Sequence, residues 1–117
     1  IKVEIDFIKV SSYGSGTESS RDVKIDLDIT SSITDRNILI LDDIIHTGHT
    51  LHFLSKHIQS HSPAKLSTCV LLDKPSRREV EFNVDYIGFE IPDLFVVGYG
   101  LDFNEQYRCL PDISRID

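Results

Sequence analysis

Apolar and polar positions alternate in two segments near the start of the chain. Residues 3–10 read VEIDFIKV and residues 23–29 read VKIDLDI, and both are rich in β-branched side chains. Alternation of this kind predicts half-buried β-strands. Residues 11–21 between them (SSYGSGTESSR) are dense in Ser and Gly and show no periodicity, which indicates a loop. We therefore expect two strands that flank a mobile tip.

Short apolar runs without alternation follow further along the chain. Residues 38–41 and 66–72 form two such runs, which suit strands buried on both faces of a parallel sheet. Residues 86–91 and 95–100 indicate two more strands, and the polar residues 73–81 before them indicate a loop. The tail that follows has no regular pattern, so we expect it to be irregular.

A helical pattern separates the first two of these runs. Leu51, Leu54 and Ile58 recur at intervals of three and four, so we expect a helix over residues 50–61. The Ser-Pro pair that follows then ends the helix. Strands that alternate with a helix predict an α/β fold with a mainly parallel sheet flanked by helices.

Length, charge and cysteine content narrow the class of protein. The 117 residues suit a single domain, and the net charge of -7 disfavours a nucleic-acid-binding face. No apolar run is long enough to span a membrane, and the first residues carry no signal-peptide pattern. Cys69 and Cys109 lie far apart and share no metal-type spacing, so we expect reduced thiols in a cytoplasmic protein.

The most informative stretch is residues 38–51, ILILDDIIHTGHTL. A buried strand there carries Asp42 and Asp43 to its carboxyl end, where α/β proteins bind ligands. Carboxylates accept hydrogen bonds from ribose hydroxyls, while Thr47, Gly48 and the amides of a helix start suit a phosphate. On this interpretation the stretch binds a ribose 5-phosphate. The alternative is structural, with two acids that end a strand and a Thr47 that caps a helix.

This stretch resembles the phosphoribosyl-pyrophosphate motif of type I phosphoribosyltransferases: four apolar residues, two acids, two apolar residues and a Thr-Gly turn. Residues 85–108 (DYIGFEIPDLFVVGYGLDFNEQYR) and residues 71–78 (LLDKPSRR) resemble the purine-binding part of the hypoxanthine-guanine members. The resemblance covers residues 1–117 and implies a single α/β domain with the type I phosphoribosyltransferase fold and a small carboxy-terminal hood.

The resemblance implies a role for each matching residue around the ribose and the phosphate. Asp42 and Asp43 would bind the ribose hydroxyls. His46 stands at the position of the acid–base residue, and is the catalytic candidate. The phosphate-binding candidates are Thr47, Gly48, His49 and Thr50.

The resemblance also implies a purine pocket and a magnesium ion. Lys74 would donate to the purine 6-oxo group, Phe95 would stack on the base, and Val96 would offer its backbone groups to the base edge. Asp102 would lie beside Mg²⁺ as well as the base, and Arg108 would bind on the pyrophosphate side. The purine-binding candidates are Ile44, Lys74, Phe95, Val96 and Asp102.

Each residue of this second group also has a purely structural interpretation. Phe95 suits a core position in an apolar strand, and Asp102 suits the cap of a turn. Lys74 and Arg108 suit solvated surface charges, as most lysines and arginines are. Only the joint match of residue type and spacing favours the functional interpretation.

Ser12 and Tyr13 match the Ser-Tyr pair of the family's catalytic loop, which places that flexible loop at residues 11–22. In the family the loop closes over the site and excludes water. The implied reaction belongs to purine salvage, in which phosphoribosyl pyrophosphate and hypoxanthine or guanine give IMP or GMP with Mg²⁺ as cofactor. The resemblance further implies a cytoplasmic homo-oligomer, with no nucleic-acid or membrane partner.

Two features depart from the family pattern. His46 replaces the usual aspartate and lacks its fixed negative charge, so we expect weaker catalysis with binding retained. His49 stands where some members carry lysine. The family also carries an amino-terminal strand, helix and pyrophosphate loop before the segment that matches here. We therefore expect a fold incomplete at its amino terminus with an open strand edge, as in a trimmed chain, an incomplete gene or a truncated paralogue.

Three other functions fit part of the pattern. A catalytically impaired paralogue would keep nucleotide binding for a regulatory or assembly role, which His46 favours. Histidines at intervals of three and four from residue 46 to residue 61 suggest zinc, although two of them fall in the phosphate turn. An RNA-binding regulator on the same fold is disfavoured by the acidic charge.

Overall fold

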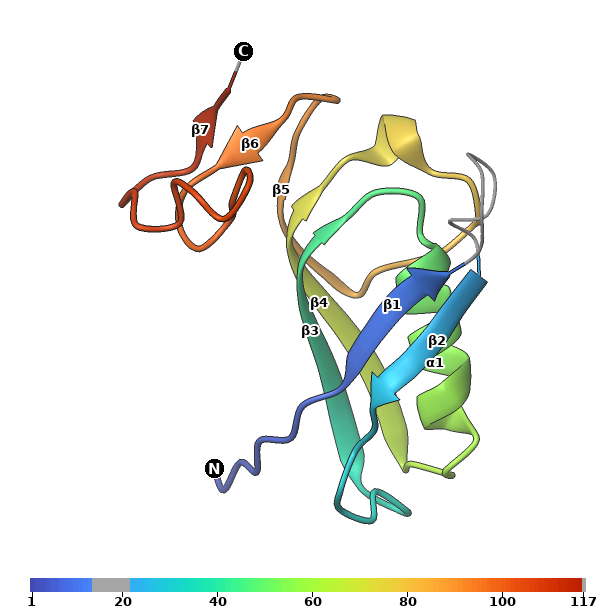
Figure 1. The fold of residues 1–117 in the computed structure, drawn as a ribbon. Helices are drawn as coiled ribbons and strands as arrows, with labels where there is room; N and C mark the ends of the chain where they lie inside the picture. Colours follow the sequence, from blue (N-terminus) through green and yellow to red (C-terminus); the bar gives the residue numbers. More distant parts are fainter. Residues whose placement is uncertain (14–21, 117) are drawn as a thin grey trace.

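The computed structural model describes residues 1–13 and 22–116, and its elements follow the predicted order (Figure 1). Seven strands, one α-helix and one 3-10 turn are present in this part of the chain. They are β1 (Lys9–Tyr13), β2 (Asp22–Leu27), β3 (Asn37–Ile45), α1 (His49–Gln59), β4 (Lys65–Asp73), η2 (Pro75–Arg77), β5 (Tyr86–Glu90), β6 (Val96–Val97) and β7 (Ser114–Arg115).

The centre of the fold is a parallel sheet with the strand order β3-β4-β5. Helix α1 connects β3 to β4 and lies against one face of the sheet (Figure 1). Leu51 and Leu54 from the helix join Ile45 and Val70 from the strands in the buried core cluster. The helical spacing seen in the sequence therefore marks the face that is removed from water.

The first two strands form an antiparallel hairpin beside this unit, in the order β1-β2. Ile8 and Val10 are partly buried against the core cluster, so the hairpin covers part of the helix side of the sheet. Asp6 accepts hydrogen bonds from the amides of Thr30 and Ser31, at 2.8 and 3.3 Å, which fastens the segment before β1.

The predicted first strand was wrong at both ends. Residues 3–8 alternate in sequence, but among the described residues they have no strand partner, and residues 1–7 are exposed. Alternation makes a strand only where a neighbouring strand takes its backbone hydrogen bonds. Ser11, Ser12 and Tyr13, predicted as loop, instead pair with β2. The rest of the predicted loop, residues 14–21, lies outside the described residues.

Three other boundaries differ from the prediction. β3 runs through the acidic pair to Ile45, because its pairing with β4 continues to Asp73. α1 spans His49–Gln59 and so ends two residues before the predicted position. β6 is only two residues long, and Gly98 and the residue after it have positive φ angles that end the strand. The tail, predicted to be irregular, returns as β7 to pair with β6.

The second face of the parallel sheet is largely open. Leu39, Leu41 and Tyr86 are 52%, 71% and 58% exposed. Within the described part of the chain β3 pairs with β4 alone, so its outer edge is free, as predicted.

In the same residues, both α1 and η2 are too short to span a bilayer.

Candidate functional site

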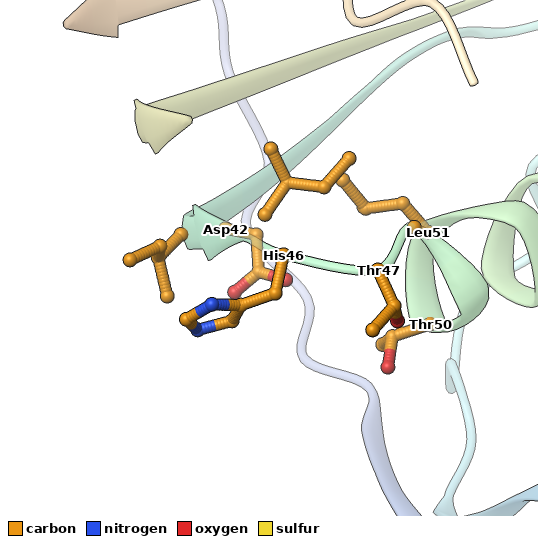
Figure 2. A pocket seen from close by; sticks show the side chains of 8 residues that line it. Asp42, His46, Thr47, Thr50 and Leu51 are labelled. Carbon is orange, nitrogen blue, oxygen red and sulfur yellow. The ribbon is translucent and has the colours of Figure 1, made fainter. Parts of the chain in front are cut away.

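A cavity of about 100 Å³ lies where β3 passes into α1. Figure 2 shows Asp42, His46, Thr47 and Thr50 projecting to the same side of this turn. The hydroxyls of both threonines and one carboxylate thus face a common space at the carboxyl end of a parallel strand. The full lining is Asp42, Ile44, Ile45, His46, Thr47, Gly48, Thr50 and Leu51.

Gly48 shapes the turn and precedes the helix as its N-cap. Its φ of 92° lies in the left-handed region, which side chains with a Cβ adopt at a cost. A Cβ at this position would also meet Val80 Cγ2 at 3.1 Å and Arg78 Cδ at 3.2 Å. The turn therefore needs glycine for its conformation and for its close approach to the segment after η2.

The start of α1 leaves amide groups available to an anion. No side chain of the described residues caps the helix, and the amide of His49 only reaches Thr47 Oγ1 at 3.4 Å. Within residues 1–13 and 22–116, no acceptor is bonded to the amides of Thr47, Gly48 or Thr50. Unpaired amides at a helix amino terminus attract negatively charged oxygens.

The acidic pair divides between two environments. Asp42 lines the cavity, whereas Asp43 is exposed and lies outside its lining. Burial raises the pKa of Asp42 from its ordinary 3.8 to about 6, and the carboxyl of Asp43 beside it acts in the same direction. The sequence grouped the two acids together, but the alternation of a β-strand turns successive side chains to opposite faces.

His46 lies at the edge of the cavity and is half-buried. Burial lowers the pKa of His46 below its ordinary 6.5, and the positive charges of Lys74 and Arg77 lower it further. The carboxylates of Asp43 and Asp93 act in the opposite direction and do not cancel this effect. The imidazole is therefore neutral at pH 7, with one nitrogen free to accept a proton.

His49 and Lys74 lie on either side of the turn. The His49 Nε2 atom is 3.1 Å from Glu79 Oε1, so the imidazole is held by a carboxylate. Lys74 is only 5% exposed, and its amide donates to the carbonyl of Ile45 at 3.0 Å. That bond fixes the end of β4 beside the turn, at the position predicted for a purine-binding lysine.

The other predicted residues gather in the carboxy-terminal hood, residues 95–116. The rings of Phe95 and Phe103 meet edge to face, with centroids 5.4 Å apart. Arg108 Nη2 lies 3.4 Å from Asp102 and 3.0 Å from Glu105. None of these hood residues lines the cavity, so the structure brings them together with one another rather than with the turn.

Asp102 was predicted to lie beside Mg²⁺, and its surroundings fit the role of a single carboxylate ligand. Its carboxylate is partly exposed, accepts from the amide of Glu105 at 2.8 Å, and keeps acceptor capacity. Among the described residues no three His, Cys, Asp or Glu side chains gather as a metal site. One carboxylate is nevertheless enough for a magnesium ion that takes its other oxygens from phosphates and water.

The remaining predicted residues belong to β1 and to the series of histidines. Ser12 is an exposed residue of β1, and Tyr13 is the last residue of that strand. Of the histidines considered for zinc, His57 Nε2 lies 2.9 Å from Asp28 Oδ1, while His61 Nδ1 lies 3.0 Å from the carbonyl of His57. His57 of α1 and His61 after it thus each contact an oxygen atom of the chain.

The sequence did not predict Arg78 and Asp73 as residues of the site. Arg78 contacts the turn directly, and Asp73 is connected to the turn through Arg78. Arg78 donates to the carbonyl of His46 and to the carboxylate of Asp73, both at 2.7 Å. Asp73 ends a buried strand, and this was the available signal. Nothing in the sequence separates Arg78 from the adjacent Arg77, because the difference arises only when the segment folds over the turn.

Known proteins similar to this chain share one domain. The phosphoribosyl transferase domain matches residues 1–104. Hypoxanthine phosphoribosyltransferase of Escherichia coli (strain K12) is 50% identical over 113 residues, which cover 97% of this chain and 64% of that protein. The chain thus spans slightly under two thirds of the length of that relative.

Solved structures give the same result for the fold. A hypoxanthine-guanine phosphoribosyltransferase from Bacillus anthracis matches with a TM-score of 0.89 and 50% identity, covering 96% of this chain and 66% of that one. Hypoxanthine phosphoribosyltransferase from Trypanosoma cruzi, in complex with the product IMP, matches with a TM-score of 0.90 and 43% identity, covering 100% and 61%. The predicted type I phosphoribosyltransferase fold is confirmed.

Proposed function

This chain belongs to the phosphoribosyl transferase domain family, and we propose that its protein acts in purine salvage. It transfers the ribosyl 5-phosphate group of phosphoribosyl pyrophosphate to N9 of hypoxanthine or guanine. The bond from the ribose carbon to pyrophosphate breaks, the bond to N9 forms, and IMP or GMP is released with pyrophosphate. The names of the similar enzymes support this reaction, as does the product IMP in the Trypanosoma cruzi complex. The protein acts in the cytoplasm as a homo-oligomer.

The observation that carries this proposal is the turn between β3 and α1. It combines a carboxylate, two threonine hydroxyls and amides that have no acceptor in the described part of the chain around one cavity. The amides and hydroxyls of residues 47–50 bind the 5-phosphate, while Asp42 and Asp43 accept hydrogen bonds from the ribose hydroxyls. Both ends of a ribose 5-phosphate are then held by residues within nine positions of one another, which orients the reacting carbon.

His46 transfers a proton at N7 of the purine. The lowered pKa keeps its imidazole neutral at pH 7, with a nitrogen that can accept a proton, so it can act where the family usually has aspartate. It does not supply the negative charge that would stabilise a cation-like ribose carbon in the transition state. Turnover is therefore slower than with a carboxylate at this position, while nucleotide affinity is kept.

The purine is held by Lys74 and by the hood. Lys74 donates to the 6-oxo group, which favours oxopurines over aminopurines. Phe95 stacks on the base, and its edge-to-face contact with Phe103 supports the stacking surface. The backbone of Val96 meets the base edge, and Ile44 contributes apolar contact. The catalytic loop, with Ser12 and Tyr13, closes over the site and excludes water.

Magnesium is the cofactor of the proposed reaction. Asp102 would hold it together with oxygens of the pyrophosphate, and the bound ion would neutralise charge on the leaving group. Arg108 lies next to Asp102 and supplies a planar, forked donor on the pyrophosphate side.

The first test is calorimetry of the chain with IMP and GMP, followed by an assay of nucleotide formation from phosphoribosyl pyrophosphate, purine base and Mg²⁺. We expect binding and slow turnover. Thr47→Val removes one cavity hydroxyl and should weaken IMP binding about 5-fold, whereas Thr34→Val, which removes a hydroxyl bonded to the carbonyl of His61, should not. Binding without turnover would replace the enzyme proposal with that of a nucleotide-binding paralogue, and absence of binding would show that these 117 residues alone do not form the site.

A further inference from the structure

Three successive carbonyl groups of the phosphate turn are bonded to one segment of the chain. Lys74 donates its amide to Ile45 at 3.0 Å, and Arg78 donates its guanidinium to His46 at 2.7 Å. The carbonyl of Thr47 accepts from the amides of residues 79 and 80, at 2.9 and 3.1 Å. The turn is therefore held from its carbonyl side by the connection between β4 and β5.

Arg78 is the only side chain among these three donor sets, the others being backbone amides. Its guanidinium spans the His46 carbonyl and the carboxylate of Asp73, with both contacts at 2.7 Å. The side chains are 20% and 4% exposed, so this ion pair is shielded from solvent. A short charge-assisted contact in such surroundings has a defined geometry, unlike a surface ion pair.

The carbonyl side of a turn determines where its amides point. A peptide group is planar, so fixing the oxygen of His46 also fixes the amide hydrogen of Thr47 on the opposite side. The carbonyl of Thr47 sets the amide of Gly48 in the same way. The amides of Thr47 and Gly48 have no acceptor among the described residues, so this arrangement presents them to the cavity side.

We infer that Arg78 is a positioning residue for phosphate binding, with Asp73 as its buried counter-ion. It orients the amides of Thr47 and Gly48 through the carbonyl of His46, without contacting the ligand. Because Asp73 is followed directly by Lys74, the same ion pair also fixes the strand end that carries the purine-binding lysine. The inference rests on the proposed function in one respect only, namely that the anion bound at the turn is the 5-phosphate of a nucleotide.

Arg77 provides a matched control beside Arg78. It carries the same charge one residue earlier, but its side chain is 51% exposed and lies 3.4 Å from Asp93 at the surface. It makes none of the bonds to the turn described above. Arg77→Gln therefore removes the same long-range positive charge while it leaves the carbonyls of the turn bonded.

The ligand test compares IMP with inosine, which lacks the phosphate, by calorimetry on the 117-residue chain. We expect Arg78→Gln to weaken IMP binding about 10-fold and inosine binding less than about 2-fold. Arg78→Lys keeps one charged donor and should recover part of the IMP affinity. A variant that loses IMP and inosine equally, or that binds IMP like the parent, would overturn the inference.

A second readout is independent of any ligand. Hydrogen exchange of the Glu79 and Val80 amides, which bond to the carbonyl of Thr47, reports whether the turn is held. We expect these amides to exchange about 10-fold faster in Arg78→Gln than in Arg77→Gln. Equal exchange in the two variants would sink the inference, even if the parent chain binds no nucleotide. Failure of IMP binding in the parent chain would by itself count against the proposed function alone.

Discussion

At the scale of single residues, the site contains two side chains, Asp42 and His46, whose burial disfavours their charged forms. Asp42 is ionised at neutral pH although burial raises its pKa to about 6. His46 is kept neutral by burial and by the positive charges of Lys74 and Arg77. Groups held away from their ordinary pKa values gather where ligands bind, and here they lie at one strand end.

Asp42→Asn should stabilise the chain and weaken its ligand binding. The raised pKa means that the folded state loses stability as pH rises through about 6. The neutral variant should therefore be more stable at pH 7.5 by roughly 1 kcal/mol, after allowance for solvent screening. The difference should shrink at pH 5, where Asp42 is protonated. Urea denaturation at both pH values measures this, with the exposed Glu81→Gln as control.

The same variant should bind IMP more weakly, because an amide replaces one acceptor of the ribose hydroxyls by a donor. A loss of about 10-fold is expected from one charge-assisted hydrogen bond. Equal stability of the two chains at pH 7.5 would show that Asp42 carries no burial penalty. Equal IMP affinity would show that its carboxylate does not bind the ribose.

His46→Asp should raise turnover while it leaves affinity nearly unchanged. A carboxylate restores negative charge near the purine and the cation-like ribose carbon, and we expect a gain of at least about 10-fold in kcat at pH 7. The affinity for IMP should change less than about 3-fold, because the 5-phosphate and ribose contacts remain. His52→Asp makes the same charge change outside the cavity lining and should leave kcat as it was. A kcat unchanged by His46→Asp would show that the missing negative charge at residue 46 does not slow turnover.

The acid side of the pH profile gives the complementary evidence. Because the pKa of His46 is lowered, its loss of function on protonation should lie below pH 6.5 in the parent chain. This fall in kcat at acid pH should disappear in His46→Asp and persist in His52→Asp. If kcat still falls at acid pH in both variants, the titrating group would have to be another one, such as Asp42.

Sequence and structure agree most closely over the stretch from Asp42 to Thr50. Residue type and spacing predicted a strand end, a glycine turn and a helix start. The turn and the helix start are present, whereas the strand continues to Ile45, past its predicted end at Leu41. Local sequence specifies such features because their hydrogen bonds and φ angles involve neighbours in the chain. Arg78 and Asp73 were not predicted, since their contact with the turn depends on how the chain beyond β4 folds back.

At the scale of elements, two features fix the turn between β3 and α1. They are its own backbone conformation and the contacts of the segment that covers it. Gly48 has φ 92° and faces Val80 and Arg78, whereas Gly100 has φ 98° and nothing near its missing Cβ. The two glycines thus share one backbone requirement, and only the first also has a steric one. They form a matched pair for measuring what the covering segment contributes.

Gly48→Ala should cost more stability than Gly100→Ala. Both substitutions place a Cβ in the left-handed region, at about 1–2 kcal/mol each. Gly48→Ala must also displace Val80 or Arg78, so we expect about 1 kcal/mol more destabilisation and a clear loss of IMP affinity. Thermal unfolding of the two variants measures the difference. Equal losses would show that the segment after η2 yields freely and does not hold the turn.

The element boundaries show where sequence patterns stop being informative. The alternating residues 3–8 form no strand in the described part of the chain, while the polar residues Ser11 and Ser12 do. Pairing is a property of two segments, and periodicity in one of them cannot locate its partner. The longer β3 has the same origin, because pairing with β4 carries the ladder past the acidic pair.

At the scale of the whole molecule, the parallel sheet has one covered and one open face. Leu41 of β3, Cys69 of β4 and Tyr86 of β5 are neighbours in register, and Leu39 lies on the same face two residues earlier. The outer edge of β3 has no strand partner among residues 1–13 and 22–116, so this face and this edge offer apolar surface and backbone groups to another chain. The net charge of -7 makes copies of this chain repel one another, but this repulsion opposes their association only in part.

The 117-residue chain should therefore self-associate through this face, and Leu39→Lys should reduce the association. A charge on the open face must lose its hydration when two such faces meet, at a cost of several kcal/mol. Leu27→Lys is the matched control, because Leu27 has the same 52% exposure as Leu39 but lies in the β1-β2 hairpin. Sedimentation velocity from about 5 to 100 μM should show association for the parent chain and for Leu27→Lys, and a monomer for Leu39→Lys. If both lysine variants associate like the parent, the contact lies elsewhere and the open face is not what brings the chains together.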